Sequence, residues 1–391
     1  MAACLEEEEE EGFTGLGGDL ETMASCVEEE AGFFMPPFLY EDEEETALLE
    51  AVDAELLRRE AEEARKEEER RRRGAVHQAV LDSILERDPK TGREVYTRYS
   101  FTDFSIFDID EESLIPPMRF TNTGYIRGLT LEDSANIHSV KIVSSDRGFP
   151  INVYGTIIAR DIVDHKCIYI FNRHRENCQT INSEEESLIL TGPDRGLVLL
   201  DFVYIEMNLK IKVDEEPHDQ QISKGLLGSD GRVQPRDEKI NVGSQTLKSW
   251  LSFVEVRYAT ILNAVEGTFE IELLEGHFCG KIKASIEGIE DKVVIHNSEE
   301  DGLVTSGDRT IMKLQCRVLT IFLGKMLTFE LTSKGCNLRG CVGAPDSTSE
   351  RSVEFPPQRR GQEVAEVSCG FGKLLVKVVW SLMDILGRSS Y

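Results

Sequence analysis

Residues 148–213 read GFPINVYGTIIARDIVDHKCIYIFNRHRENCQTINSEEESLILTGPDRGLVLLDFVYIEMNLKIKV. Apolar and polar residues alternate through much of this stretch, and turn signals at 148–150, 161–166 and 192–196 divide it into pieces of strand length. Alternation with a period of two is typical of strands that have one face in a core and the other in water. The stretch therefore predicts the centre of an all-β domain.

Further strands are expected on both sides of this stretch. The alternation is clearest at 205–213, where every second residue from Ile205 is apolar, and at 374–380, which ends in Trp380. About a dozen short strands with turns between them indicate a mainly β fold, an antiparallel β-sandwich over 138–391. The expected strands lie at 138–144, 151–161, 167–172, 188–192, 196–213, 250–262, 268–275, 281–287, 291–296, 310–332 and 374–380. A polar connection is expected at 214–248 and an exposed, flexible insertion at about 333–367.

Three segments precede the sandwich. Residues 1–40 predict a disordered acidic arm with an apolar patch that contains Phe33, Phe34 and Phe38. Such a patch is either a protein-docking peptide or a chance feature of a solubilising tail. Residues 41–87, rich in Glu, Ala, Leu and Arg, predict a long charged α-helix; its scarce apolar residues favour a solvated single helix over a coiled coil. Residues 88–137 predict an aromatic-rich lead-in arm.

The charge of the chain is unevenly distributed. The formal net charge is −28, and residues 1–63 hold 22 of the 72 acidic side chains but only 2 of the 44 basic ones. The remainder lacks the concentrated basic face of a nucleic-acid-binding domain, so nucleic acid is not an expected partner. Nine cysteines at scattered spacings fit a reducing compartment, the cytoplasm or the nucleus. No apolar run is long enough to cross a bilayer, so no membrane association is expected.

Arginines in two turns are the candidate partner-binding residues. Arg173, His174 and Arg175 follow a strand directly and offer forked guanidinium groups for a phosphate or a carboxylate. The alternative is a solvated strand end. Arg195 lies in the turn GPDRG, where proline, aspartate and glycine all favour a turn, and its side chain is available to a partner.

The sequence offers two metal-site alternatives and no catalytic motif. Asp161, Asp164 and His165, with Asp146 and Asp194, would form a calcium site only if their loops converged, and an ordinary turn is favoured. Cys336 and Cys341 would need His277 or Cys279 to hold zinc, at a spacing unlike that of zinc fingers. The sequence contains no G-x-S-x-G, G-x-x-x-x-G-K-[ST] or G-x-G-x-x-G motif. We therefore predict no catalytic, cofactor-binding or metal-binding residue.

Several phrases resemble a known family, the plant domain of unknown function 6598, which is abundant in grasses. The phrases cover about residues 88–383, and GPDRGLVL and VYGTIIARD are the most specific. They are REVY at 93–96, FTDFSIFDIDEES at 101–113, HSVKIVSSDRGFPINVYGTIIARD at 138–161, DHKCIYIFNRHRENCQ at 164–179, LTGPDRGLVLLDFVYIEMNLKIK at 190–212, SKGLLG at 223–228, VEVRYATILNAVEGTFEIELLEG at 254–276 and KLLVKVVWSLM at 373–383.

The resemblance implies a role but no activity. Some relatives carry this domain beside a ribosome-inactivating N-glycosylase domain, which implies a link to stress or defence. The string EEAR at 62–65 lies in the charged helix and does not form that active site. We expect a non-enzymatic intracellular protein-interaction module with an unidentified protein partner. The alternatives are a toxin- or translation-associated factor, by analogy with the fused relatives, and a glycosidic enzyme, which would need paired carboxylates in a cleft.

Overall fold

The computed structural model describes residues 43–121, 130–213, 218–231, 238–299, 301, 303–306, 309–334 and 348–383. The chain divides into two compact units, Met1–Glu67 and Glu68–Tyr391. The acidic arm predicted at 1–40 lies outside the described residues, and with it Phe33, Phe34 and Phe38. All strands within the described ranges belong to the second unit.

The charged helix predicted at 41–87 is confirmed as α1 (Glu43–Ile84), which has 42 residues. Its apolar side chains between 48 and 57 are exposed, and ion pairs one turn apart, such as Glu62 with Lys66 and Glu69 with Arg72, lie on its surface. Such pairs add a few tenths of a kcal/mol each to a helix, on the order of 0.2–0.5. Among the described residues, no helix is both long and apolar enough to span a bilayer.

The last turns of α1 are different from its start because they pack on other residues of the second unit. Val80, Leu81 and Ile84 form a small cluster with Phe104, Phe107 and Ile109. A short antiparallel pair follows directly, made of β1 (Leu85–Arg87) and β2 (Glu94–Tyr96).

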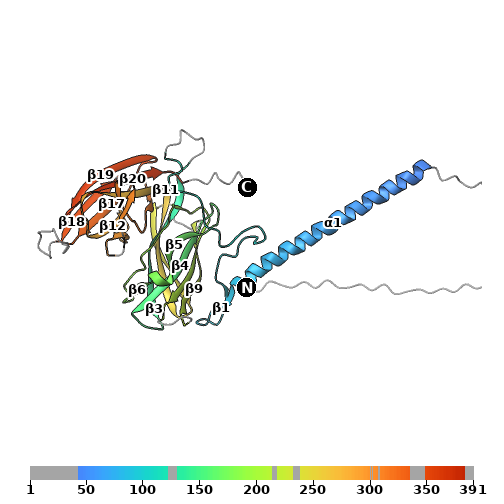
Figure 1. The fold of residues 1–391 in the computed structure, drawn as a ribbon, viewed down its shortest axis with the longest axis horizontal. Coiled ribbons are helices and arrows are strands. Elements are labelled where there is room, and N and C mark those ends of the chain that lie inside the picture. Colours follow the sequence, from blue (N-terminus) through green and yellow to red (C-terminus); the bar gives the residue numbers. More distant parts are fainter. Residues whose placement is uncertain are drawn as a thin grey trace, which may run out of the picture. The chain divides into compact units, whose positions relative to one another are not determined.

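The rest of the second unit is mainly β with antiparallel pairing, which confirms the predicted fold class (Figure 1). We divide it into an N-lobe and a C-lobe that share the long strand β11 (Ser252–Gly276). The N-lobe contains β3 (Glu132–Ser145), β4 (Ile151–Arg160), β5 (Ile168–Arg173), the short 3₁₀ helix η1 (Arg175–Asn177), β6 (Gln179–Ile181), β7 (Leu197–Val198), β8 (Phe202–Ile211), β9 (Gln220–Asp230) and β10 (Ile240–Ser249). The C-lobe contains β12 (Gly280–Ile286), β13 (Val293–Asn297), β14 (Leu303–Ser306), β15 (Arg309–Met312), β16 (Val318–Phe322), β17 (Leu327–Ser333), β18 (Ser349–Phe355), β19 (Gly361–Cys369) and β20 (Gly372–Ser381).

Strand β11 belongs to both lobes because it changes neighbours half-way. Its residues 252–261 pair with β3 on one side and with β10 on the other. Its residues 264–276 pair with β16, β15 and β20. The pairing with β3 is irregular between Ile261 and Ala264, and Asn263 there has a positive φ of 53°. Asparagine tolerates that region better than most residues, so it suits the point where the strand changes lobes.

Each lobe has its own apolar core, a division that the alternation pattern did not predict. In the N-lobe, the sheet with the order β5-β4-β8-β9 packs on β3 and the first half of β11. In the C-lobe, the sheet with the order β13-β12-β17-β18 packs on the second half of β11, on β16 and on β20. The inward-facing residues expected at 374–380 are confirmed: Leu374, Val376, Val378 and Trp380 are all fully buried.

Two expected connections contain strands. The polar connection predicted at 214–248 is wrong for most of its length, because it contains β9 and β10. The prediction of a flexible insertion at 333–367 is also wrong for the described residues of that range, because β18 and most of β19 lie there. All four strands carry many small or polar residues, and each lies at or near an edge of its sheet. Their sequences therefore lack the apolar content that marks central strands.

Candidate functional site

Residues 97–113 lie across the outer face of the N-lobe sheet. Arg98 and Tyr99 contact Glu206 on β8, and Glu111 and Ser113 exchange backbone hydrogen bonds with Cys167 just before β5. We call residues 97–113 the strap. The lead-in predicted at 88–137 is thus an ordered layer in this part.

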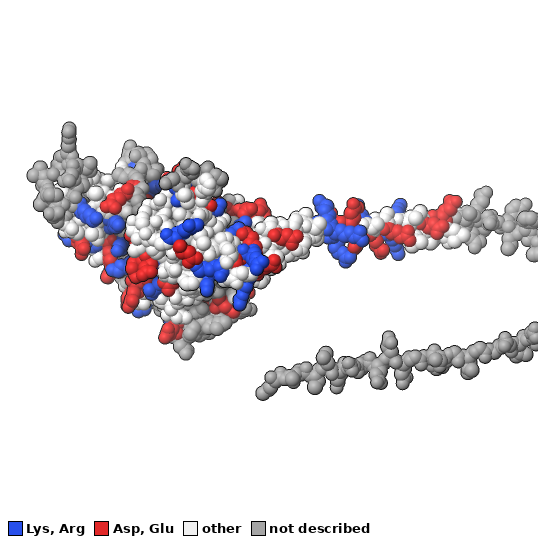
Figure 2. Space-filling model, turned by 90° about the horizontal axis from the view of Figure 1, so that it is seen from below, with Lys and Arg blue, Asp and Glu red and all other residues white. Residues whose placement is uncertain are grey.

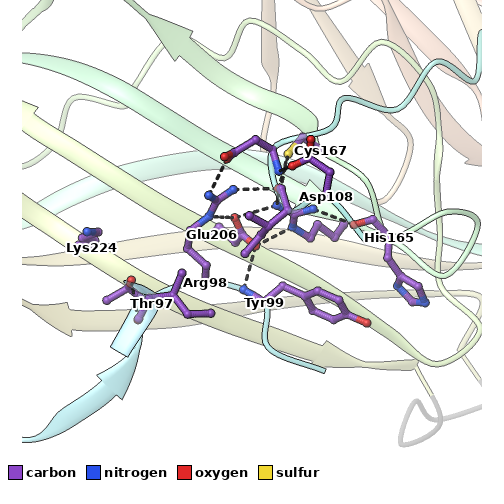
Figure 3. Close-up of polar contacts among 12 residues, drawn as sticks. Thr97, Arg98, Tyr99, Asp108, His165, Cys167, Glu206 and Lys224 are labelled. Carbon is purple, nitrogen blue, oxygen red and sulfur yellow. Dashed lines mark hydrogen bonds and ion pairs between the residues drawn. The ribbon is translucent and has the colours of Figure 1, made fainter. Parts of the chain in front are cut away.

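An ion cluster holds the strap on the sheet (Figure 3). The Glu206 carboxylate binds Arg160 of β4 at 2.6 Å and Arg98 of the strap at 3.1 Å, and it accepts the backbone N–H of Tyr99 at 2.9 Å. Arg160 is fully buried and Glu206 is 3% exposed. Burial lowers the pKa of Arg98, but the carboxylates of Glu206 and Asp110 raise it by more, so the net shift is upward. Removing one partner from such a cluster leaves an uncompensated buried charge.

The guanidinium groups of the cluster have further partners inside the protein. Arg160 donates to the backbone oxygens of His165 and Ile109, at 2.8 and 2.6 Å. Arg98 donates to the same Ile109 oxygen at 3.0 Å and to the Asp110 carboxylate at 2.7 Å. Because these bonds end on the strap and on the turn after β4, the cluster ties three segments together.

Stacked aromatic rings extend from the ion cluster to the surface. Phe101 of the strap stacks on Tyr204 at 5.4 Å between ring centroids, and Tyr204 stacks on Phe202 at 5.6 Å. We call Phe101, Tyr204 and Phe202 the aromatic ladder. Tyr99 packs against Tyr204 from the buried side, and burial raises the pKa of Tyr99 to about 12. Phe101 is 65% exposed although it belongs to this ordered stack.

A cavity of about 400 Å³ lies beside the ion cluster, between the outer face of the sheet and the segment that follows α1. We call it the outer-face cavity. Its charged lining consists of Glu86, Arg98, Asp110, Glu206 and Lys224. Lys224 pairs with Glu86, and Arg98 with Asp110 and Glu206, so these charges are already partnered.

The turn residues Asp161 and Asp164 are brought together with Arg195. The Arg195 guanidinium binds Asp161 in a bidentate manner, at 2.6 and 2.8 Å, and approaches Asp164 at 3.4 Å. Arg195 is only 3% exposed, and the neighbouring carboxylates help to raise its pKa against the effect of burial. Asp161 also accepts the backbone N–H of Val198 at 2.9 Å. The arginine thus takes the place that the calcium alternative would give to a cation.

The other carboxylates of the calcium alternative lie elsewhere. Asp146 binds Lys90 at 2.8 Å, and Asp194 lies 4.0 Å from Arg317 with most of its side chain exposed. Of the zinc candidates, His277 stacks on Phe371 at 5.4 Å, Cys279 is a free thiol, and Cys336 and Cys341 lie outside the described residues. Among the residues that are described, no three metal-ligating side chains gather.

The run Arg173, His174 and Arg175 is split between two environments. Arg173 and His174 line a groove of about 610 Å³ whose other wall includes Lys313 and Gln315 of the C-lobe. Arg175 turns away and binds Asp219 at 2.6 Å. That bond, together with the N–H of Val213 and the Tyr154 hydroxyl, holds the pKa of Asp219 well below its usual range. Arg175 is therefore used within the N-lobe.

Sequence reasoning missed the ion cluster. Glu206 alternates with apolar residues along β8, which predicted a solvent-facing side chain. Arg98 is 108 residues away from it along the chain, and Arg160 is 46 residues away. No local period links residues at such separations, so only the folded structure brings them together.

Charged residues of both signs are distributed over the face of the molecule in Figure 2. The face shown has no large area of a single sign.

Comparisons with known proteins add one assignment. A search of the curated proteins found no match. A solved structure, human GIVD cytosolic phospholipase A2, is similar over 63% of this chain and 32% of its own, about a third of its length, with 10% identity and a TM-score of 0.20. A likeness this low carries no argument. The family model described as Domain of unknown function (DUF6598) matches residues 134–378, from β3 to β20. The chain therefore belongs to the DUF6598 family.

Proposed function

We propose that this protein is a non-enzymatic protein-interaction module and that the aromatic ladder is its contact surface. The observation that carries the proposal is the position of Phe101, which is 65% exposed and yet stacked on Tyr204. Aromatic residues are enriched at protein interfaces and supply many of the residues that dominate binding. An exposed, ordered aromatic stack is a surface that a partner would cover.

The ion cluster supports this proposal by ordering the strap. Tyr99 donates its backbone N–H to Glu206, and Tyr99 packs under Tyr204, so the residues around Phe101 are fixed before a partner arrives. A surface that is ordered in the free protein loses less conformational entropy on binding. The cluster therefore favours the affinity of the ladder without contacting the partner.

The use of charged groups supports a non-enzymatic role. A catalytic acid, base or anion-binding group needs hydrogen-bond donors or acceptors that are directed at a substrate. Here the charged groups bind each other and the backbone instead, both in the cluster of Arg98, Arg160 and Glu206 and in the pair of Arg195 and Asp161. These groups stabilise the fold, and the proposed function assigns no cofactor.

Only some of the partner-binding residues predicted from the sequence remain candidates in this proposal. Arg173 and His174 line the groove between the lobes and remain candidates for a second contact with a partner. Arg175 and Arg195 are engaged within the fold. The plant origin, the fusion of relatives to N-glycosylase domains, the stress or defence role and the intracellular location stay predictions.

The test compares two exposed aromatic residues. Phe101→Ser removes the outer ring of the ladder, and Phe371→Ser is the matched control, a 43% exposed ring in the C-lobe that stacks on His277. Partners captured with the wild-type chain are identified by quantitative mass spectrometry, and the affinity of the strongest is measured by calorimetry. We expect Phe101→Ser to weaken it by at least about 30-fold, the effect of losing a dominant contact of roughly 2 kcal/mol.

The control should bind like the wild type, and both variants should keep the wild-type melting temperature within a few degrees. Equal capture by the wild type and by Phe101→Ser would show that the ladder is not the contact surface. A turnover of any captured small molecule by the purified chain would contradict the non-enzymatic role.

A further inference from the structure

The outer-face cavity differs from the aromatic ladder in both shape and lining. Its volume of about 400 Å³ falls in the range of small-molecule sites, roughly 300–1,000 Å³. Its floor is formed by residues of β4, β5, β8 and β9, and its rim by the end of α1 and by the strap. A ligand could occupy this cavity whether or not a protein covers the ladder, so its role is independent of the proposed protein contact.

The charges around the outer-face cavity balance one another. Glu206 is bound to two arginines, one of which also binds Asp110, and Lys224 is bound to Glu86. Three carboxylates thus face three cations when Arg160 behind the floor is included. A phosphate or a carboxylate would have to displace an existing ion pair, and so would a cation. The electrostatics therefore favour a neutral ligand.

Three neutral side chains of the same lining keep hydrogen-bonding capacity that the described residues do not use. Within the described part of the chain, the Tyr169 hydroxyl and the Thr156 hydroxyl have no hydrogen-bond partner, and the amide nitrogen of Asn208 has none either. The Asn208 side chain is engaged only through its oxygen, which accepts from Gln221 at 3.0 Å. A tyrosine hydroxyl is protonated at neutral pH, and burial raises the pKa of Tyr169 further. These groups offer both donors and acceptors to a ligand.

Apolar surface lies between these polar groups. Ile158 contributes to the lining, as does the aromatic side chain of Tyr169. A ligand that fits must therefore present C–H surface as well as several hydroxyl groups, without a net charge. A pyranose ring has this combination, because its hydroxyls lie around the edge and its C–H groups lie on the faces.

We propose that the outer-face cavity is a binding site for a neutral sugar, of the size of a mono- or disaccharide. Asn208, Thr156 and Tyr169 hydrogen-bond its hydroxyl groups, and Ile158 and the ring of Tyr169 contact its C–H surface. The Arg98 and Lys224 ion pairs keep the cavity wall in place and leave no net charge for an ionic competitor.

Binding is tested on the full chain by saturation-transfer NMR and calorimetry with maltose, cellobiose, xylobiose and lactose as probes. Inorganic phosphate is the charged comparison. We expect at least one disaccharide to bind and phosphate not to compete with it. Asn208→Ala should weaken that binding by about tenfold, and Tyr169→Phe, which removes only a hydroxyl, by about fivefold, as expected for hydrogen bonds of roughly 1 kcal/mol.

Asn152→Ala, at an exposed asparagine of β4 outside the cavity lining, is the matched control and should bind the sugar like the wild type. Melting curves verify that each variant is folded, and Tyr169→Phe is conservative enough to remain so. The proposal is overturned if none of the four disaccharides binds, if binding is unchanged in both Asn208→Ala and Tyr169→Phe, or if phosphate displaces the sugar.

Discussion

The N-lobe and the C-lobe share β11 but differ in what lies on the outer faces of their sheets. The N-lobe sheet is covered by the strap, and between the two lies the buried cluster of Arg98, Arg160 and Glu206. The outer face of the C-lobe sheet bears a pair that water reaches, Lys292 with Glu330, whose side chains are 44% and 37% exposed. Charged groups therefore hold a covering segment on the sheet of the N-lobe, whereas on the C-lobe sheet this pair remains exposed to water.

The cores show a second difference. In the C-lobe, Phe329 contacts Phe269 and Phe355 at ring-centroid distances of 5.2 and 5.6 Å, and Trp380 is fully buried. In the N-lobe core, aliphatic side chains dominate, and the aromatic rings gather on the outer side with the strap. The C-lobe is therefore stabilised by ordinary apolar packing, whereas charged and aromatic groups of the N-lobe order a surface.

The largest loss of stability is expected for Glu206→Ala. It leaves Arg160 and Arg98 without their shared carboxylate, and we expect the free energy of unfolding to fall by about 3–5 kcal/mol, as for other broken buried ion pairs. Urea unfolding followed by circular dichroism measures the change. Glu354→Ala on β18, where the side chain is exposed, is the matched control and should stay within about 0.5 kcal/mol of the wild type. Equal effects of the two substitutions would contradict a structural role for the cluster.

His138 predicts a pH dependence at the junction of the lobes. It is buried on β3 beside the ion pair of Arg257 and Asp291, and among the described residues neither ring nitrogen has a hydrogen-bond partner. Burial lowers its pKa to about 4, with Arg257 adding to the effect and Asp291 opposing it. The unfolded chain, with a histidine pKa near 6.5, binds the proton more tightly, so stability is lost as the pH falls from about 6.5 to 4, by up to about 3 kcal/mol.

Replacing His138 isolates this contribution. Unfolding free energies of the wild type and of His138→Gln are measured at pH 7 and pH 4.5, and the difference between the two pH values is compared. We expect the variant to lose less stability on acidification than the wild type. The same loss in both proteins would assign the acid sensitivity to other groups.

The C-lobe core is expected to respond more weakly to a conservative substitution. Ile295 is fully buried on β13, and Ile295→Val removes one methylene group from the apolar core. We expect a loss of about 1 kcal/mol in urea unfolding, typical of this substitution. A loss as large as that of Glu206→Ala would mean that the C-lobe core is not the tolerant, apolar region described here.

The smallest effect is expected for the exposed pair of the C-lobe. Lys292→Ala removes a partner of Glu330, but both side chains are accessible to water. Exposed pairs contribute about 0–1 kcal/mol, and salt screens them. The unfolding free energy should therefore change by less than about 1 kcal/mol, and the change should shrink further in 0.5 M salt, at roughly half the Debye length of physiological salt. A larger loss of unfolding free energy that does not depend on salt would contradict the difference proposed between this exposed pair and the buried Glu206 cluster.

The fold class could be predicted because central strands bury every second residue. Val376 and Val378 of β20 are examples, and so is Met207 of β8. The edge strands could not be predicted, because β9, β10 and β18 keep much of their surface in water and need few apolar residues. The candidate site was missed for a different reason. The carboxylate of Glu206 is buried by the strap, and the pairing of residues 108 positions apart depends on tertiary structure alone.

The ion cluster is what we hold responsible for keeping the strap, and with it the aromatic ladder, in place on the N-lobe. Hydrogen exchange of the amides in residues 97–113 is the decisive experiment, because the Tyr99 amide donates to Glu206. We predict that the Tyr99 amide is protected in the wild type, and that Glu206→Gln speeds exchange in residues 97–113 but not in β17. Exchange in the wild-type strap as fast as in an unfolded peptide would contradict this role of the cluster.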